Sequence, residues 1–146
     1  MSTQDIQLIH WDPDKEGELS EQAMRDKLVA MGYQVSRYVY TEGTVFPDHN
    51  HDVDKIDAVL AGRFRMSMHG EYVMLEAGDC LVVPRGVVHS AEVIGEQAVI
   101  SLDAIKIDWS IVKLQSGSCN LKPRSKTQHF LDVWKYFLLQ SPILYR

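Results

Sequence analysis

The stretch GDCLVVPRGVVH, residues 78–89, decides the fold of this chain. Its apolar run LVV at 81–83 consists of residues that favour β-strands. The tripeptide PRG at 84–86 interrupts that run, because proline fixes φ and glycine permits a positive φ. The apolar residues 87–88 restart the strand, and His89 follows on it. The stretch therefore predicts a strand, a tight turn and a second strand that carries one histidine.

A second stretch, GTVFPDHNHDVDKIDAVLAG at 43–62, lies upstream and carries two more histidines. His49 and His51 are two residues apart, and on a strand this spacing puts both imidazoles on one face, roughly 6–7 Å apart along the chain. If the sheet curls, His89 can meet them at one point.

The chain around these stretches has the pattern of an all-β domain. The segment YQVSRYVYT at 33–41 alternates with a period of two, which predicts a half-buried strand but does not say which face lies inside. Glycine-containing turns separate six further predicted strands, at 56–60, 63–68, 72–75, 80–83, 87–93 and 98–104. Seven or eight short antiparallel strands of this kind are typical of a sandwich or a barrel.

The first 32 residues predict a strand and a helix. IQLIHW at 6–11 is strand-like, and residues 20–32 predict a helix with Ser20 as its N-cap. Met24, Leu28 and Met31 form one apolar stripe, and Gly32 stands where a helix ends in a left-handed residue. We expect this helix to pack on the outside of the barrel.

The two histidine-bearing stretches resemble the two motifs of the cupin superfamily. The resemblance covers roughly residues 33–105 and indicates a small single-domain cupin. Eight of ten motif positions match, namely Gly43, His49, His51 and Gly62 in the first motif and Gly78, Pro84, Gly86 and His89 in the second. The two departures are Lys55, where the family has a glutamate ligand, and Val93, where it has an asparagine.

The resemblance implies the cupin double-stranded β-helix, a jelly-roll barrel, at 33–106, with 1–32 as an N-terminal extension. Residues 107–146 form a C-terminal extension of different character, with a net charge of +4 against −9 for residues 1–106. Within it, the aromatic and apolar spacing at 127–140 is compatible with a second helix. Small cupins are commonly dimers, so the resemblance also implies a homodimer.

The three histidines predict a mononuclear metal site. Neutral imidazoles bind divalent ions, here iron, zinc, manganese, nickel or copper, which such ligands alone do not distinguish. Three protein ligands that leave positions open are typical of a catalytic site. The motif spacing makes these histidines predicted ligands rather than isolated core residues.

Lys55 leaves the occupancy of that site open, because a protonated ammonium about 6 Å from a divalent ion is repelled by about 5 kcal/mol at an effective dielectric near 20. Lys55 can point out of the barrel, or it can fill the site and silence it. Asp57, two residues on and on the same strand face, is a predicted replacement ligand. Asp54 and Asp57 can also hold Lys55 away as ion pairs. Cupins with three histidines and no glutamate exist, and some resemble dioxygenases of dicarbonyl or thiol substrates.

Other residues near the motifs have weaker signals. Asp48 is a candidate to orient a ligand histidine, and Arg85 to contact an anionic substrate. Cys80, in an apolar strand, predicts a buried inert thiol. Five apolar residues are candidates for the wall of a cavity, although packing in the core explains them equally well: Phe46, Met66, Met68, Met74 and Leu81.

Three classes of function remain from the sequence: a metal-dependent enzyme acting on a small organic molecule by dioxygenase-like or isomerase-like chemistry, a small-ligand binding or sensing protein, and a structural cupin with a vestigial site. The net charge of −5 argues against a nucleic-acid partner. The longest uncharged run, 136–145, is too short to span a bilayer, and the start MSTQDIQ has no signal-peptide pattern. We therefore expect a cytoplasmic protein without a membrane partner.

Overall fold

The computed structural model describes residues 5–108 as nine strands and two helices. In chain order they are β1 (Leu8–His10), α1 (Pro13–Glu16), α2 (Glu21–Ala30), β2 (Tyr33–Tyr40), β3 (Val45–His49), β4 (Lys55–Ala61), β5 (Arg63–Met68), β6 (Glu71–Leu75), β7 (Asp79–Val83), β8 (His89–Ile94) and β9 (Val99–Lys106). The second helix predicted at 127–140 lies outside the described residues.

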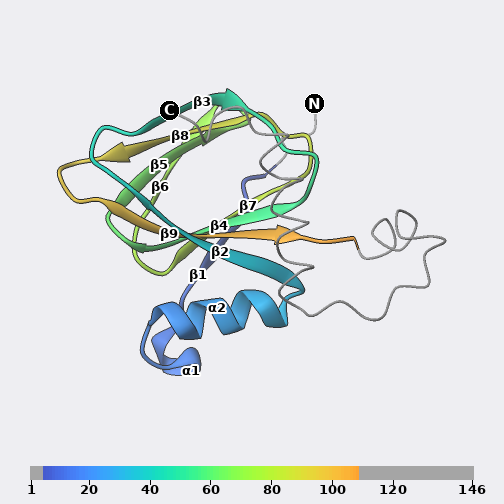
Figure 1. Cartoon of the computed structure of the whole chain (residues 1–146), viewed down its shortest axis with the longest axis vertical. Coiled ribbons are helices and arrows are strands. Elements are labelled where there is room, and N and C mark those ends of the chain that lie inside the picture. Colours follow the sequence, from blue (N-terminus) through green and yellow to red (C-terminus); the bar gives the residue numbers. More distant parts are fainter. Residues whose placement is uncertain (1–4, 109–146) are drawn as a thin grey trace, which may run out of the picture. The chain divides into compact units, whose positions relative to one another are not determined.

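The strands form two antiparallel sheets that face each other, as Figure 1 shows. One sheet has the strand order β1-β7-β4-β9-β2, and the other has the order β3-β8-β5-β6. The chain crosses between the sheets repeatedly, so that strands distant in sequence become neighbours. This arrangement confirms the predicted all-β jelly-roll barrel. Within the described residues, no helix combines the length and apolar character needed to cross a membrane.

The five-stranded sheet is covered on both faces, which explains why the first five of the seven residues of β4 are all buried. Its inner face packs against the four-stranded sheet, and its outer face is covered by α2 (Figure 1). The inner cluster contains Val59, Phe64, Met66, Met68, Leu75, Leu81, Val83, Ala91, Val93 and Val99. The cluster under the helix contains Met24, Leu28, Val35, Ile56, Ala58, Cys80, Leu102 and Ala104.

Helix α2 begins as the sequence predicted. The Ser20 hydroxyl accepts a hydrogen bond from the Ala23 amide at 3.1 Å, and Gly32 after the helix has a φ of +93°. Met24 and Leu28 are fully buried, but Met31 is 41% exposed. The prediction that Met31 belongs to the buried stripe was wrong. The helix ends at Ala30, so that Met31 is its C-cap and no longer follows the helical period.

Strand β2 directs its even-numbered residues into the barrel, which settles a question that its sequence left open. Tyr40 packs on Phe46 and Phe64, with ring centroids 4.9 and 5.6 Å apart, whereas Val35 faces α2. Of the residues predicted to form either a cavity wall or part of the core, Phe46, Met66, Met68 and Leu81 lie in or against the inner core cluster. Met74 was assigned wrongly, because it pairs with the exposed Arg65 on the outer face.

Among the glycines that the structure describes, Gly62 comes closest to neighbouring backbone. Gly62 has a φ of +80°, and a Cβ there would lie 2.6 Å from the carbonyl oxygen of Ala98. We predict that Gly62→Ala lowers the free energy of unfolding by about 2–4 kcal/mol, from a left-handed backbone and a backbone clash together. Urea denaturation followed by circular dichroism measures the loss.

Gly70→Ala is the matched control for this substitution. Gly70 has a similar φ of +79°, but nothing lies within 4 Å of the added Cβ. Only the conformational cost of about 1 kcal/mol is expected there. Equal losses for the two variants would contradict a close approach at Gly62.

Candidate metal centre

Two strand ends and one loop position the three histidines. His49 is the last residue of β3, His89 is the first residue of β8, and the two are directly paired across the sheet. His51 lies beyond the end of β3, in the loop before β4. The prediction that His49 and His51 share a strand was therefore wrong. A register shift between Phe46 and His49 ends the regular pairing there.

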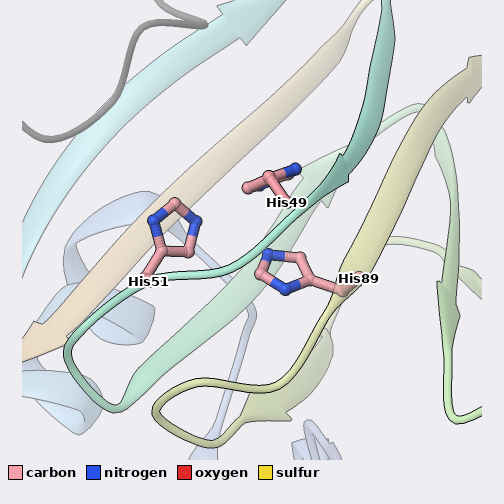
Figure 2. A group of neighbouring side chains, drawn as sticks. All are labelled: His49, His51 and His89. Carbon is pink, nitrogen blue, oxygen red and sulfur yellow. The ribbon is translucent and has the colours of Figure 1, made fainter.

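The three imidazoles nevertheless converge, as Figure 2 shows. The ring centroids of His49 and His89 lie 4.3 Å apart, and that of His51 lies 4.9 Å from His49 and 5.1 Å from His89. One nitrogen from each ring lies within 4.8 Å of those of the other two. The structure brings together the three histidines that the sequence singled out.

Backbone carbonyls fix which nitrogen of two of these rings carries the proton. Nδ1 of His49 lies 2.7 Å from the Pro47 carbonyl oxygen, and Nδ1 of His89 lies 2.9 Å from that of Val87. A carbonyl only accepts hydrogen bonds, so each Nδ1–H must donate. Nε2 of each neutral ring then keeps its lone pair. The predicted orienting role of Asp48, which is exposed, is thus filled by main-chain carbonyls.

Burial keeps His51 and His89 uncharged. Burial, together with the smaller effects of the charges of Lys55 and the other two histidines, lowers the pKa of His51 to about 3. Burial also lowers the pKa of His89 to about 4, partly opposed by its hydrogen bond to Val87. Both rings are therefore neutral at pH 7, which is the form that binds metal ions.

The turn at 84–86 holds the His51 loop in place. The Gly86 amide donates a hydrogen bond to the His51 carbonyl at 2.8 Å, and the Arg85 amide donates one to Asp54 Oδ1 at 2.8 Å. The Arg85 guanidinium forms an exposed ion pair with Asp52 at 2.7 Å. The proline–glycine turn and the first histidine motif are thus joined directly, although some 30 residues separate them in sequence.

Lys55 lies inside the barrel, bound to two carboxylates. Its Nζ is 3.1 Å from Asp57 Oδ1 and 3.0 Å from Asp103 Oδ2, and the lysine is only 5% exposed. Burial by itself would lower the pKa of Lys55, but the charges of Asp103 and Asp57 and the hydrogen bonds to them raise it above its ordinary value. Lys55 is therefore protonated and ion-paired at neutral pH.

This cluster of Lys55, Asp57 and Asp103, the buried ion triad, changes what the lysine does to the histidine site. Burial and the charge of Asp57 raise the pKa of Asp103, whereas the charge of Lys55 and its hydrogen bond lower it. The two carboxyl groups reduce the repulsion of a divalent ion by Lys55, but the lysine charge still lowers the pKa of both His51 and His89.

The predicted fourth ligand, Asp57, is not part of the group of ligand atoms that converge in the described residues. Its carboxylate binds Lys55. Of the arrangements open from the sequence, the structure is nearest to lysine held by ion pairs, with Asp103 in the place foreseen for Asp54. Sequence reasoning missed Asp103, although a lone acidic residue in the apolar strand AVISLDAI was a usable signal.

Comparisons with known proteins agree with this architecture. Residues 36–105 match the family described as "Cupin domain". No curated protein sequence matches the chain significantly. Among solved structures, a single-residue mutant of the salicylate 1,2-dioxygenase from Pseudoaminobacter salicylatoxidans is similar, with a TM-score of 0.51 and 19% identity over 56% of this chain and 24% of that one.

Two further solved structures are also similar. The cupin domain of Schizosaccharomyces pombe Cnp3 has a TM-score of 0.50 and 18% identity, over 56% of this chain and 57% of that one. A cupin superfamily protein from Desulfitobacterium hafniense has a TM-score of 0.47 and 16% identity, over 74% of this chain and 83% of that one. Identities this low speak for a shared fold, not for a shared activity.

The buried ion triad predicts that a variant of Lys55 loses much more stability than a variant of Arg85. Lys55→Met leaves two facing carboxylates buried without their cation, and we expect a loss of about 3–5 kcal/mol in unfolding free energy. Arg85→Met removes only an exposed ion pair and should cost at most about 1 kcal/mol. Chemical denaturation of both variants measures this difference. A Lys55→Met protein as stable as the wild type would contradict the triad.

The neutral histidines predict acid destabilisation of the metal-free protein. Their folded pKa values of about 3 and 4 lie below the unfolded value near 6.5, so the unfolded state binds more protons between pH 6.5 and 4. Stability therefore falls as the pH falls through this window, by about 1–3 kcal/mol after allowing for solvent screening of the half-exposed His51. Thermal unfolding across pH 4–8 measures the slope. His51→Asn should flatten it, and an unchanged slope would contradict a buried neutral His51.

Proposed function

The chain belongs to the cupin superfamily, and from that premise we propose that His49, His51 and His89 hold one divalent metal ion at which a small organic molecule binds and reacts. The reaction class proposed is dioxygenase-like or isomerase-like. Iron, zinc, manganese, nickel and copper all suit a set of imidazole ligands.

One observation carries this proposal: the lone pair of His89 Nε2 is buried and has no hydrogen-bond partner among the described residues. His89 is 2% exposed, so water does not reach it freely. Its Nδ1–H is committed to the Val87 carbonyl, which leaves Nε2 as an acceptor pointing at the other two rings. A metal ion satisfies such a lone pair, as in other histidine sites whose second nitrogen is fixed by a carbonyl.

The spacing of the rings fits an ion after a modest contraction. Imidazole nitrogens bound to one ion at 2.0–2.1 Å in tetrahedral geometry lie about 3.4 Å from one another. The three nitrogens here lie within 4.8 Å. Rotation of His51, which comes from a loop, can close much of this difference without moving a strand.

When bound, the ion would supply a Lewis acid with open coordination positions. The chain contributes the rest: Pro47 and Val87 orient two rings, and the turn at Gly86 holds the loop that carries His51. Asp57 and Asp103 pair with Lys55, which stands in place of the family's glutamate ligand, and so reduce the repulsion between its ammonium and the ion.

A second function, ligand binding or sensing without turnover, is favoured by one specific observation. The family's glutamate position is Lys55, and its ammonium is engaged in ion pairs inside the barrel. A site with three neutral ligands holds metal less tightly than one with an added carboxylate. This protein would then bind a small molecule beside a weakened or vestigial metal site.

Elemental analysis of the untagged protein tests metal binding. We expect about one divalent ion per chain in the wild type and at least a tenfold lower content in His51→Ala. His10→Ala is the matched control, because His10 is exposed, pairs with Asp79 and lies outside the group of three. Added metal should also raise the melting temperature of the stripped wild type, but not that of His51→Ala.

The outcomes of these assays separate the two functions. Metal lost only in His51→Ala, together with oxygen uptake or isomer formation on dicarbonyl or thiol substrates, supports the enzyme. Metal without any turnover supports binding or sensing. A wild type that neither contains nor takes up metal contradicts the metal centre.

A further inference from the structure

One carboxylate oxygen inside the barrel has no hydrogen-bond partner. Asp103 Oδ2 binds Lys55 at 3.0 Å, whereas Asp103 Oδ1 is buried and has no partner within the part of the chain that the structure describes. The Asp103 side chain is only 10% exposed. A carboxylate offers acceptors alone, so rotating it cannot remove the deficit. Folded proteins satisfy such a group with a donor from a ligand, an ion or an ordered water.

A second buried acceptor, on the neighbouring strand β2, also lacks a hydrogen-bond donor within the described residues. Gln34 Oε1 is also buried without a partner among residues 5–108, and it is an acceptor too. Gln34 lies on β2, on the same inward face as Ser36, which is paired directly opposite Asp103 on β9. Two acceptors on adjacent strands thus face the barrel interior together, and both require an N–H or O–H donor.

The charge of this region restricts the donor further. Asp57 and Asp103 are directly opposite each other on β4 and β9, and Lys55 is the one cation bound between them. Two carboxyl groups facing one ammonium in a buried setting disfavour an anionic group and favour a neutral or cationic one.

We infer that the inner face of β2, β4 and β9 beside the histidines binds the hydroxyl or ammonium end of a small molecule that carries no net negative charge. Asp103 Oδ1 and Gln34 Oε1 accept its hydrogen bonds, and Lys55 holds Asp103 in position. This inference deepens the proposed function and rests on it in placing the other end of the molecule at the metal centre.

Two small probes of similar size and opposite charge test this specificity. Ethanolamine carries an ammonium and a hydroxyl, and glycolate carries a carboxylate and a hydroxyl. Each is titrated into the full chain loaded with Co²⁺, whose visible spectrum reports binding at the ion. A matched titration of the metal-free chain is followed through its amide resonances in ¹H–¹⁵N NMR spectra.

Asp103→Asn should change the two affinities in opposite directions. This isosteric substitution keeps an oxygen for Lys55 but removes the negative charge. We expect ethanolamine to bind about tenfold more weakly and glycolate several-fold more tightly, because one charge-assisted hydrogen bond and one repulsion are lost. A general change in the metal site would move both affinities the same way.

Two further variants separate the effect of losing a negative charge anywhere on the protein from the effect of losing a hydrogen-bond acceptor at this site. Glu92→Gln removes a negative charge from the outer face, where Glu92 pairs with Arg65, and should move neither affinity. Gln34→Leu removes the second acceptor without changing the charge. It should weaken ethanolamine at least threefold and leave glycolate unchanged. If Asp103→Asn fails to fold, Gln34→Leu decides the matter.

Each outcome counts for or against the inference. Equal shifts for both probes in Asp103→Asn, or no shift, overturn it and leave ordered water as the partner of Asp103. A chain that binds no Co²⁺ refutes the metal centre instead. In that case the metal-free titration decides: ethanolamine perturbing the amides of β2 and β9 in the wild type but not in Asp103→Asn supports the inference, and no perturbation overturns it.

Discussion

The ion pairs of Lys55 with Asp57 and Asp103 are the interaction on which the barrel interior depends. Three charged side chains lie on the inner face of the five-stranded sheet, a place where most other residues are apolar. Burying one of these charges alone would cost several kcal/mol, so each is tolerated only because the others are present. The triad makes the barrel interior polar at this place.

The histidine site depends on that region and on main-chain geometry rather than on a charged ligand. Carbonyls from the residues two positions before His49 and His89 set their tautomers, and burial keeps the His89 ring neutral. The glutamate that completes the site in the family is replaced by the lysine of the triad. The carboxyl groups of Asp57 and Asp103 pair with this lysine.

The similarity to solved cupins supports the fold and leaves the chemistry to the site. The dioxygenase and the cupin domain of Cnp3 are at most 19% identical to this chain. The same barrel supports different activities because its strands fix the histidine positions, whereas the inward residues of the neighbouring strands choose the ligand. In this chain those inward residues include Gln34, Asp103 and the rest of the triad.

The sequence by itself determined the all-β barrel, the helix outside it and the meeting of His49, His51 and His89. These features follow from local signals, namely two-residue alternation, a serine N-cap and glycine turns, and from motif spacing shared with the cupins. The tertiary structure alone decided the partners of Lys55, because Asp103 lies 48 residues away and becomes a neighbour only through the pairing of β4 with β9. It also decided which face of β2 lies inside, since alternation gives two equivalent faces until one packs against a helix.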